Sequence, residues 1–289
     1  MKTILVPTDF SETANYALEV AVQLSKKTNS KLVLLHMLEI KDHLLPSVSE
    51  TNDVINPILS SGGNPPAAVF YMKLAHKNFE ALREHKFLEG VTYEEAIQNH
   101  LNFNEINTTA KKYQADIIVM GSHGATGLKE VFVGSHTEKV VRSSEIPVIV
   151  IKNKHLDFNV KNLVFVTDLK TDTLSTLKKA FAFCKQLDAK LYLLHINTPG
   201  DAFMTSNDID EKINHLVKEA GFDPNKFEVQ KYNDRDIEKG IINFSKSIGA
   251  DLIAIPTHAR RGLAHFFNHN LSEEMVNHFD IPVITFKID

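Results

Sequence analysis

The sequence predicts an α/β protein made of two tandem Rossmann-like domains, each with a five-stranded parallel sheet flanked by helices. Three observations support this fold class. The chain of 289 residues has the length of about two domains. Short apolar runs alternate with amphipathic segments, which is typical of a parallel sheet covered by helices on both faces. The second half of the chain also repeats the first.

The repeat is visible in two blocks. Residues 115–151 begin ADIIVMGSHG and align without a gap with residues 250–286, which begin ADLIAIPTHA, at an offset of 135. Residues 4–37 align with residues 163–196 at an offset of 159. The two offsets differ by 24, so the first half contains 24 additional residues, which fall within residues 39–100.

In the first half, the apolar run at residues 4–6 predicts a buried strand that leads into Thr8 and Asp9. The helix that follows has apolar residues at helical spacing from Tyr16 to Leu24. The insertion is expected to hold a loop at 42–64 and a long helix at 67–85 that begins after two prolines. The other strands of this half are expected at residues 31–37, about 91–97, 116–120 and 147–151, with a helix at about 104–113.

The second half repeats these elements, with a helix at about 235–248 and strands at residues 163–166, 190–196, about 227–232, 251–255 and 282–286. A polar segment at 153–162 joins the two halves. We therefore expect a first domain at 1–152, which contains the insertion at about 39–100, and a second domain at 162–289.

Composition excludes several classes of partner. The net charge of −4 favours neither nucleic acid nor an anionic membrane surface. The apolar runs are too short for a signal peptide or for the ~20 residues that span a bilayer. The single cysteine, Cys184, excludes an internal disulfide and lies in an apolar helical stretch, which predicts a buried thiol. These features predict a cytoplasmic protein.

A set of glycines in the first half suggests a phosphate site. Gly121, Gly124 and Gly134 follow one another at the spacing G-x2-G-x9-G, and Ser135 comes next. Glycine lets anionic oxygens approach backbone amides, and a helix that begins near Ser135 would offer free N–H groups to an anion. Ser135 with Glu138 also fits a capping box, which is the structural alternative.

The second half separates these two roles. Asn270 and Glu273 occupy the aligned positions and still fit a cap, while Gly134 is replaced by His269. Capping alone therefore does not require glycine at position 134. Because Pro256 and Ala259 also replace the first two glycines, we expect the second half to bind no such phosphate group, or to bind a different small ligand. Arg260 and Arg261 would fill the vacated site or be solvated.

Asp9 and the histidines each have two interpretations. Asp9 follows the first strand, where its carboxylate would accept hydrogen bonds from ribose or adenine or would satisfy a turn. Asp168 repeats it in the second half. His36 recurs as His195, and His123 as His258, which favours structural roles for these imidazoles. No catalytic triad, paired carboxylates, Walker loop or dinucleotide fingerprint can be assembled from the sequence, and His265 with His269 suggests a surface pair rather than metal ligands.

At these residues the chain resembles the universal stress protein family, as a tandem two-domain member. The resemblance is carried by ILVPTDFSE at residues 4–12 and IIVMGSHGATGLKEVFVGSHTEKVV at residues 117–141, and it covers most of both halves. It implies an adenine nucleotide alpha-hydrolase-like fold and an ATP-binding motif, G-x2-G-x9-G-[S/T], kept in the first domain only. The fifth strands of two such domains usually pair across a two-fold axis, and here the two halves could make that pairing within one chain.

The resemblance also assigns roles to residues of the first half. Pro7, Thr8 and Asp9 would line the adenine and ribose. Met37 or Leu38, together with Met120, would pack the base. Gly121 and Gly124, with His123 between them, would approach the ribose and phosphates. Phosphates would be bound through backbone and hydroxyl groups of Gly134, Ser135, His136 and Thr137. Mg²⁺ or Mn²⁺ would accompany the nucleotide.

Three functions remain open at this stage. The first is a cytoplasmic stress-response protein that binds ATP, ADP or AMP as a regulatory ligand, forms a homodimer and acts on a protein partner. The second is a slow ATPase that releases ADP or AMP, against which the sequence shows no obvious general base near the glycines. The third is a nucleotide-free interaction scaffold. The insertion would cover the nucleotide, widen a dimer interface or receive a partner.

Overall fold

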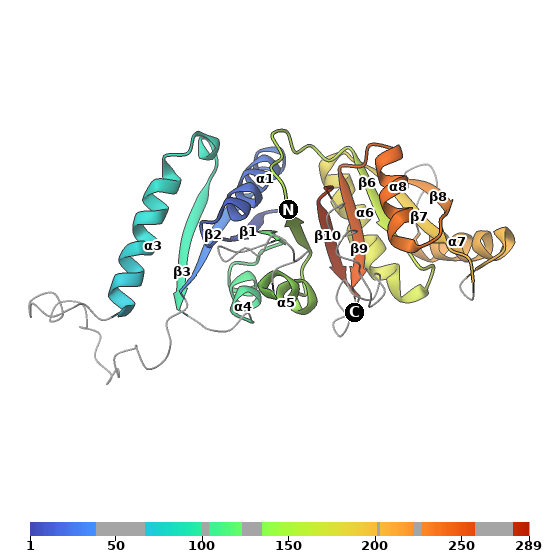
Figure 1. Cartoon of the computed structure of the whole chain (residues 1–289), viewed down its shortest axis with the longest axis horizontal. Coiled ribbons are helices and arrows are strands. Elements are labelled where there is room, and N and C mark those ends of the chain that lie inside the picture. Colours follow the sequence, from blue (N-terminus) through green and yellow to red (C-terminus); the bar gives the residue numbers. More distant parts are fainter. Residues whose placement is uncertain are drawn as a thin grey trace, which may run out of the picture.

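The computed structural model describes residues 1–38, 67–99, 104–122, 135–200, 203–221, 227–257 and 280–288. Figure 1 shows an elongated molecule in which one continuous sheet is flanked by helices. The first half contains β1 (Thr3–Pro7), α1 (Glu12–Thr28), β2 (Lys31–Leu38), α3 (Ala67–Arg83), η2 (Lys86–Leu88), β3 (Tyr93–Asn99), α4 (Asn104–Lys112), β4 (Ile117–Gly121), α5 (Ser135–Ser143) and β5 (Val148–Ile151).

The second half repeats this order with β6 (Asn162–Val166), η3 (Thr171–Thr173), α6 (Leu174–Leu187), β7 (Lys190–Asn197), α7 (Ser206–Ala220), β8 (Phe227–Asn233), α8 (Ile237–Ser247), β9 (Leu252–Thr257) and β10 (Val283–Lys287). All ten strands expected from the sequence are present, with ends shifted by one or two residues. The helix of the insertion is also present as α3. The loop expected at 42–64 lies outside the described residues.

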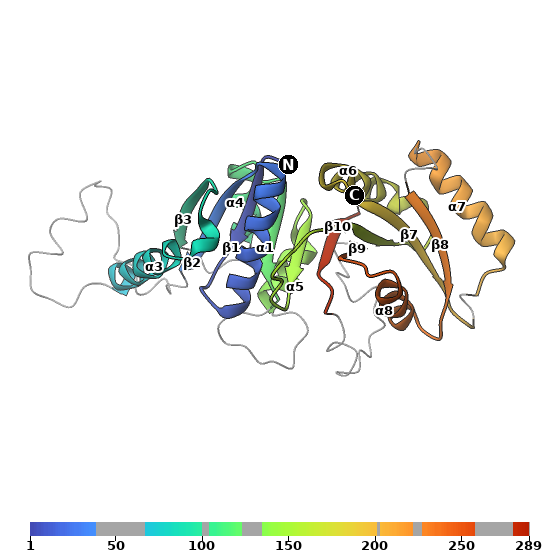
Figure 2. The ribbon, with the colours of Figure 1, turned by 90° about the horizontal axis from the view of Figure 1, so that it is seen from above.

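The two halves form one ten-stranded sheet in the order β3-β2-β1-β4-β5-β10-β9-β6-β7-β8. Within each half the strands are parallel, and the halves meet where β10 pairs antiparallel with β5, with Ile284 opposite Ile149. The expected pairing of the fifth strands within one chain is therefore confirmed. Figures 1 and 2 place α3 and α7 at opposite ends of this sheet.

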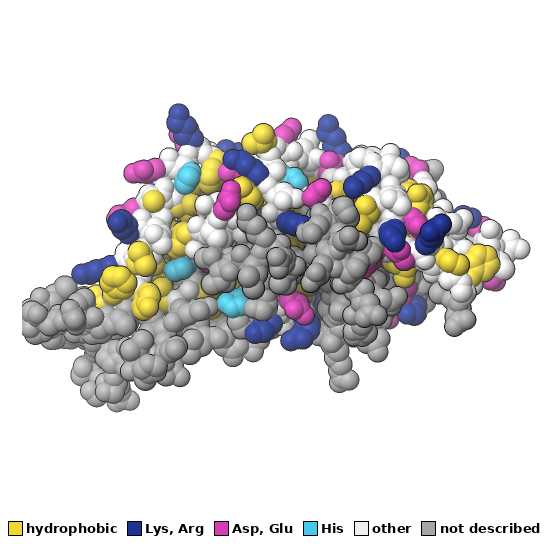
Figure 3. Space-filling model, viewed as in Figure 1, with side chains coloured by type: hydrophobic (Ala, Val, Ile, Leu, Met, Phe, Trp, Pro, Cys, Tyr) yellow, Lys and Arg dark blue, Asp and Glu magenta, His cyan; other side chains and the backbone are white. Residues whose placement is uncertain are grey.

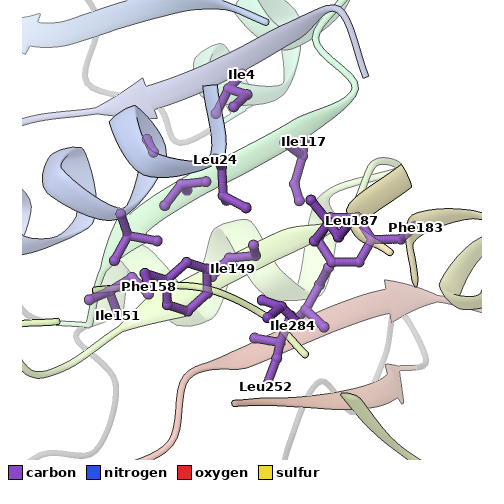
Figure 4. Close-up of a cluster of buried hydrophobic side chains, with 14 of the residues drawn as sticks. Ile4, Leu24, Ile117, Ile149, Ile151, Phe158, Phe183, Leu187, Leu252 and Ile284 are labelled. Atoms are coloured by element: carbon purple, nitrogen blue, oxygen red, sulfur yellow. The ribbon is translucent and has the colours of Figure 1, made fainter. Parts of the chain in front are cut away.

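Alternate residues of each strand enter different cores. On one face of the sheet, α1, α3, α6 and α7 contribute to a single apolar cluster that runs through both halves, from Phe79 to Phe227. Figure 4 shows this cluster at the junction, where Leu24 and Ile149 of the first half approach Phe183 and Ile284 of the second. On the other face, α4 and α5 cover one separate cluster and α8 covers another. Because the shared cluster is continuous, the two halves pack as one body on the α1/α6 face.

The segment between the halves is part of this packing. Its composition is polar, yet Phe158 and Val160 are buried in the shared cluster. The Gln23 side chain of α1 holds the segment from both sides: its Nε2 donates to the His155 carbonyl at 3.1 Å and its Oε1 accepts from the Phe158 N–H at 2.5 Å. The segment is therefore fixed on α1 and is not a free spacer.

The corresponding helices α1 and α6 begin differently. Ser11 has an extended backbone, and its hydroxyl accepts from the Ala14 N–H at 3.3 Å, which caps α1. Lys170 stands at the aligned position and makes no side-chain cap, and the first turn there is the 3-10 helix η3, so α6 begins only at Leu174. A lysine cannot accept a hydrogen bond, which accounts for the loss of the cap.

Candidate functional site

The strand order of the first half creates one switch point. The chain passes from β1 to β2 on one side and reaches β4, on the other side of β1, only after β3 and α4. In an open α/β sheet, ligands bind outside the carboxyl ends of the strands at such a point. The structure brings Pro7, Thr8 and Asp9, at the end of β1, and Gly121, at the end of β4, to this place. In the second half the equivalent point lies between β6 and β9.

The turn after β1 is held by its own side chains. The Thr8 N–H donates to the Leu35 carbonyl at 2.8 Å, and the Thr8 hydroxyl accepts from the Phe10 N–H at 3.0 Å. The Asp9 carboxylate accepts from the Ser11 N–H at 3.0 Å. Phe10 adopts the left-handed region with a φ of 62°.

The same turn recurs after β6. The Thr167 hydroxyl accepts from the Leu169 N–H at 2.9 Å, and the Asp168 carboxylate accepts from the Lys170 N–H at 3.2 Å. Leu169 has a φ of 63°. Asp9 therefore has the structural role that its recurrence indicated. The Asp9 side chain is also exposed at the switch point, so a ligand there could reach it.

Gly121 is required by packing against α1. A Cβ at this position would lie 2.8 Å from the Thr13 carbonyl carbon, 2.9 Å from the Thr13 oxygen and 3.0 Å from the Ala14 nitrogen. These are backbone atoms of the first turn of α1, which cannot move away without displacing the helix. The glycine is not explained by a positive φ, since its φ lies outside the left-handed region. Packing against α1 thus explains the first glycine of the motif without any ligand.

The helix α5 begins at Ser135, as the motif predicted, with Glu138 in its first turn. Its first N–H groups have no partner within the helix, and the helix dipole makes this end attractive to an anion. His136 is exposed, whereas Thr137 is 3% exposed and donates its hydroxyl to the Gly121 carbonyl at 2.8 Å. The predicted residues His123, Gly124 and Gly134 lie outside the described residues.

Met37 and Leu38 lie on opposite faces of the sheet. Met37 and Met120 both belong to the cluster beneath α4 and α5. Leu38 is buried on the other face against Ala75 of α3. Of the two residues expected to pack a base, Met37 is therefore the one that shares a face with Met120 and with the start of α5.

His36 and His195 occupy equivalent structural positions. The Nδ1 of His36 lies 2.8 Å from the Thr8 carbonyl, and the Nδ1 of His195 lies 3.2 Å from the Thr167 carbonyl. A carbonyl only accepts, so Nδ1 carries the hydrogen in both imidazoles. Burial lowers the pKa of His195, and its Nε2 is buried without a hydrogen-bond partner. This recurrence confirms the structural interpretation of the pair.

The second half differs at its own switch point. Pro256 lies within β9 opposite Phe286, at the place that corresponds to Gly121. A proline ring there cannot admit the close approach that the backbone of α1 makes to Gly121. This agrees with the loss of the first helical turn, which is replaced by η3. His258, Ala259, Arg260, Arg261, His269 and Asn270 lie outside the described residues.

Sequence reasoning missed two contributors to this architecture. Ser11 caps α1 and so positions the turn that carries Asp9, and its signal was a serine directly before the amphipathic stretch. The contact between Gly121 and Thr13 joins residues more than a hundred positions apart and left no local signal. In the part of the chain that the structure describes, no group of three or more metal-ligating side chains comes together. No helix among those residues is long and apolar enough to cross a bilayer.

The fold and the switch-point residues define a tandem, doubly wound α/β protein of the Rossmann-like class. A family model described as the universal stress protein family matches residues 1–152 and 159–287. The chain therefore belongs to the universal stress protein family, as a tandem two-domain member.

Individual relatives agree with this assignment. Universal stress protein MJ0577 of Methanocaldococcus jannaschii is 34% identical over 162 residues, covering 53% of this chain and 96% of that protein. Universal stress protein YxiE of Bacillus subtilis is 30% identical over 151 residues, covering 52% of this chain and 97% of that protein. A universal stress protein structure from Archaeoglobus fulgidus is similar in fold with a TM-score of 0.67 at 19% identity, covering 99% of this chain and 96% of that chain.

Proposed function

We propose that the first half binds one adenine nucleotide, ATP, ADP or AMP, as a regulatory ligand in a cytoplasmic stress response. One observation carries this proposal. The carboxyl end of β4 at the switch point and the N-terminus of α5 at Ser135 bracket the segment that contains Gly124 and Gly134. Family membership supports the same assignment. The second half, with Pro256 and His269 in place of two glycines, is proposed to bind no ATP or a different ligand.

The residues at the switch point fit such a ligand. Met37 is half-buried on the same face as Met120, which gives an apolar contact for a base. The exposed Asp9 carboxylate at the end of β1 suits a ribose hydroxyl, with Pro7 and Thr8 beside it. The phosphates are assigned to the start of α5, with Ser135 and His136, where the helix dipole favours negative charge. Mg²⁺ or Mn²⁺, when bound with the nucleotide, would neutralise part of the phosphate charge.

Regulation requires that the nucleotide bind two conformations with different affinity. The shared core of the two halves gives a physical route, because α1 contacts Gly121 at its first turn and holds the segment between the halves through Gln23. We propose that nucleotide binding changes how the chain meets a protein partner or a second copy in a homodimer. The domains are assigned to residues 1–152 and 162–289.

The test is a titration of the purified protein with Mg-ATP. The Gly134→Glu variant places a carboxylate where the phosphates are assigned and is expected to abolish binding. His269→Glu makes a substitution to the same residue at the aligned position of the second half and is expected to leave binding unchanged. If Gly134→Glu bound ATP as the wild type does, the assigned site would be wrong. Release of ADP or AMP during the same incubation would favour the slow ATPase over a purely regulatory ligand.

A further inference from the structure

The hydroxyl of Thr137 is committed to the protein itself. Thr137 lies in the first turn of α5 and is 3% exposed, and its Oγ1 donates to the Gly121 carbonyl at 2.8 Å. A threonine hydroxyl has one hydrogen to donate. While this bond exists, the hydroxyl cannot donate to a phosphate. The bond links α5 to the end of β4, and the two residues that it joins lie 16 positions apart in the sequence.

Gly121 is held on a second side by another helix. The backbone of Thr13 and Ala14 lies so close to Gly121 that even a Cβ would clash. The last residue of β4 is therefore a junction at which the first turn of α1 and the first turn of α5 both meet the strand. The Asp9 turn immediately precedes α1, whose cap is Ser11. Through Gly121, the position of α5 is thus tied to the end of β1.

We propose that Thr137 is a positioning residue for the nucleotide site and not a phosphate ligand. Its hydroxyl fixes the N-terminus of α5 against the carboxyl end of β4, so that the first N–H groups of the helix remain directed toward the switch point. This inference rests on the proposed nucleotide binding. It assigns phosphate recognition to the backbone of α5 and the alignment of that backbone to the Thr137–Gly121 bond.

The expected effect on nucleotide affinity follows from the loss of one buried hydrogen bond. Removing the hydroxyl leaves the buried Gly121 carbonyl without this donor and frees the first turn of α5 to shift. A buried hydrogen bond of this kind corresponds to a loss of about fivefold to tenfold in affinity for a ligand that depends on the alignment. Contacts to the base through Met37 and Met120 do not involve α5's first turn, so adenosine should be affected within about twofold.

The experiment compares Thr137→Val, which removes the hydroxyl, with Thr137→Ser, which keeps it. Affinities for ATP and adenosine are measured by titration, and amide hydrogen exchange in α5 is measured without nucleotide. We expect Thr137→Val to weaken ATP binding about fivefold to tenfold, to change adenosine binding by less than about twofold and to raise the exchange rates of the α5 amides in the free protein. Thr137→Ser should match the wild type in all three measurements. Should Thr137→Val fail to fold, Thr137→Ala removes the hydroxyl without adding a methyl group against the carbonyl.

Several outcomes would overturn the proposal. Unchanged ATP affinity in Thr137→Val would show that the bond positions nothing of consequence. Weaker ATP binding with unchanged exchange in the free protein would mean that the hydroxyl contacts phosphate directly. Equal weakening of ATP and adenosine would indicate a general loss of structure. If the wild type bound no nucleotide, the proposed function would fail, and the exchange data alone would decide whether the Thr137–Gly121 bond positions α5. Faster exchange in Thr137→Val would support that role, and unchanged exchange would reject it.

Discussion

Substituting Gly121 by alanine should destabilise the protein even in the absence of nucleotide. The added Cβ would lie 2.8 Å from the Thr13 carbonyl carbon and 3.0 Å from the Ala14 nitrogen, both in the backbone of α1. Relieving this clash requires α1 to move, and overpacking of this kind costs about 1–3 kcal/mol. Alanine is otherwise preferred over glycine in a strand by roughly 0.5–1 kcal/mol. Because the clash is with backbone and not with a flexible side chain, the cost should lie at about 2–3 kcal/mol, and the net loss should be about 1–2.5 kcal/mol.

Urea unfolding followed by circular dichroism measures this loss. With an m-value of about 3 kcal/mol/M, a loss of about 1–2.5 kcal/mol lowers the midpoint by roughly 0.3–0.8 M. Gly240→Ala is the matched control, since a Cβ there would also be crowded, at 2.7 Å from Cγ2 and 2.9 Å from Cδ1 of Ile196. These atoms belong to a side chain that can tilt by about 30° from its rotamer at a cost of about 0.5–1.5 kcal/mol.

The control substitution is stabilised in part by the higher helix propensity of alanine. Gly240 lies in α8, where alanine is favoured over glycine by about 0.8–1.0 kcal/mol. Its stability should stay within about 1 kcal/mol of the wild type. A Gly121→Ala variant as stable as the wild type, or one less affected than Gly240→Ala, would refute the argument that backbone packing requires this glycine.

Three further predictions each concern one side chain. Burial lowers the folded-state pKa of His195 below its unfolded value of about 6.5, so the contribution of neutral His195 to stability is complete above that pH and is lost as the pH falls. The urea midpoint should therefore drop between pH 7 and pH 5, and it should drop less in His195→Asn. An equal drop in the two proteins would contradict this prediction. Ser11→Ala should cost about 1 kcal/mol of unfolding free energy through loss of the α1 cap, while Lys170→Ala at the aligned uncapped position should change it by less than about 0.5 kcal/mol. Burial raises the pKa of Cys184 to about 12, so iodoacetamide at pH 8 should leave the native thiol unmodified and alkylate it fully in denaturant; rapid native labelling would show that the thiol is accessible.

The order of elements could be predicted because each signal is local. Apolar runs predicted the strands and helical spacing predicted α1, α3, α4 and α8, whereas α7 was not expected. The family resemblance indicated that the two fifth strands could pair within one chain, as β5 and β10 do. The switch point follows from the fold class, so the placement of Asp9 and Gly121 at adjoining strand ends could also be anticipated. These inferences needed no knowledge of which side chains touch.

The packing of the site could not be predicted in the same way. The close approach of Thr13 to Gly121 depends on how far α1 settles onto β4, which no sequence window records. The choice between Met37 and Leu38 needed the register of β2, since a shift of one residue exchanges the two faces of the sheet. The segment between the halves was expected to be a polar connection, but Phe158 docks into the shared core.

The helix α3 adds a surface that the repeat does not explain. Phe70, Tyr71, Met72 and Leu74 are all exposed on α3, with Phe70 at 56%. Figure 3 shows hydrophobic side chains gathered at this end of the molecule. In the second half, the corresponding helix α7 buries its apolar residues and begins with a capping box at Thr205. Among the described residues, the exposed apolar side chains along α3 therefore have no counterpart along α7.

The first half of the chain is proposed to bind an adenine nucleotide, and the second half is proposed to bind none. Mass spectrometry of the small molecules released on denaturing the purified protein, followed by titration with Mg-ATP, counts the occupied sites. We expect ATP, ADP or AMP at about one molecule per chain. Two per chain would contradict the loss of the second site at Pro256 and His269, and no nucleotide in either measurement would contradict the assignment of the first.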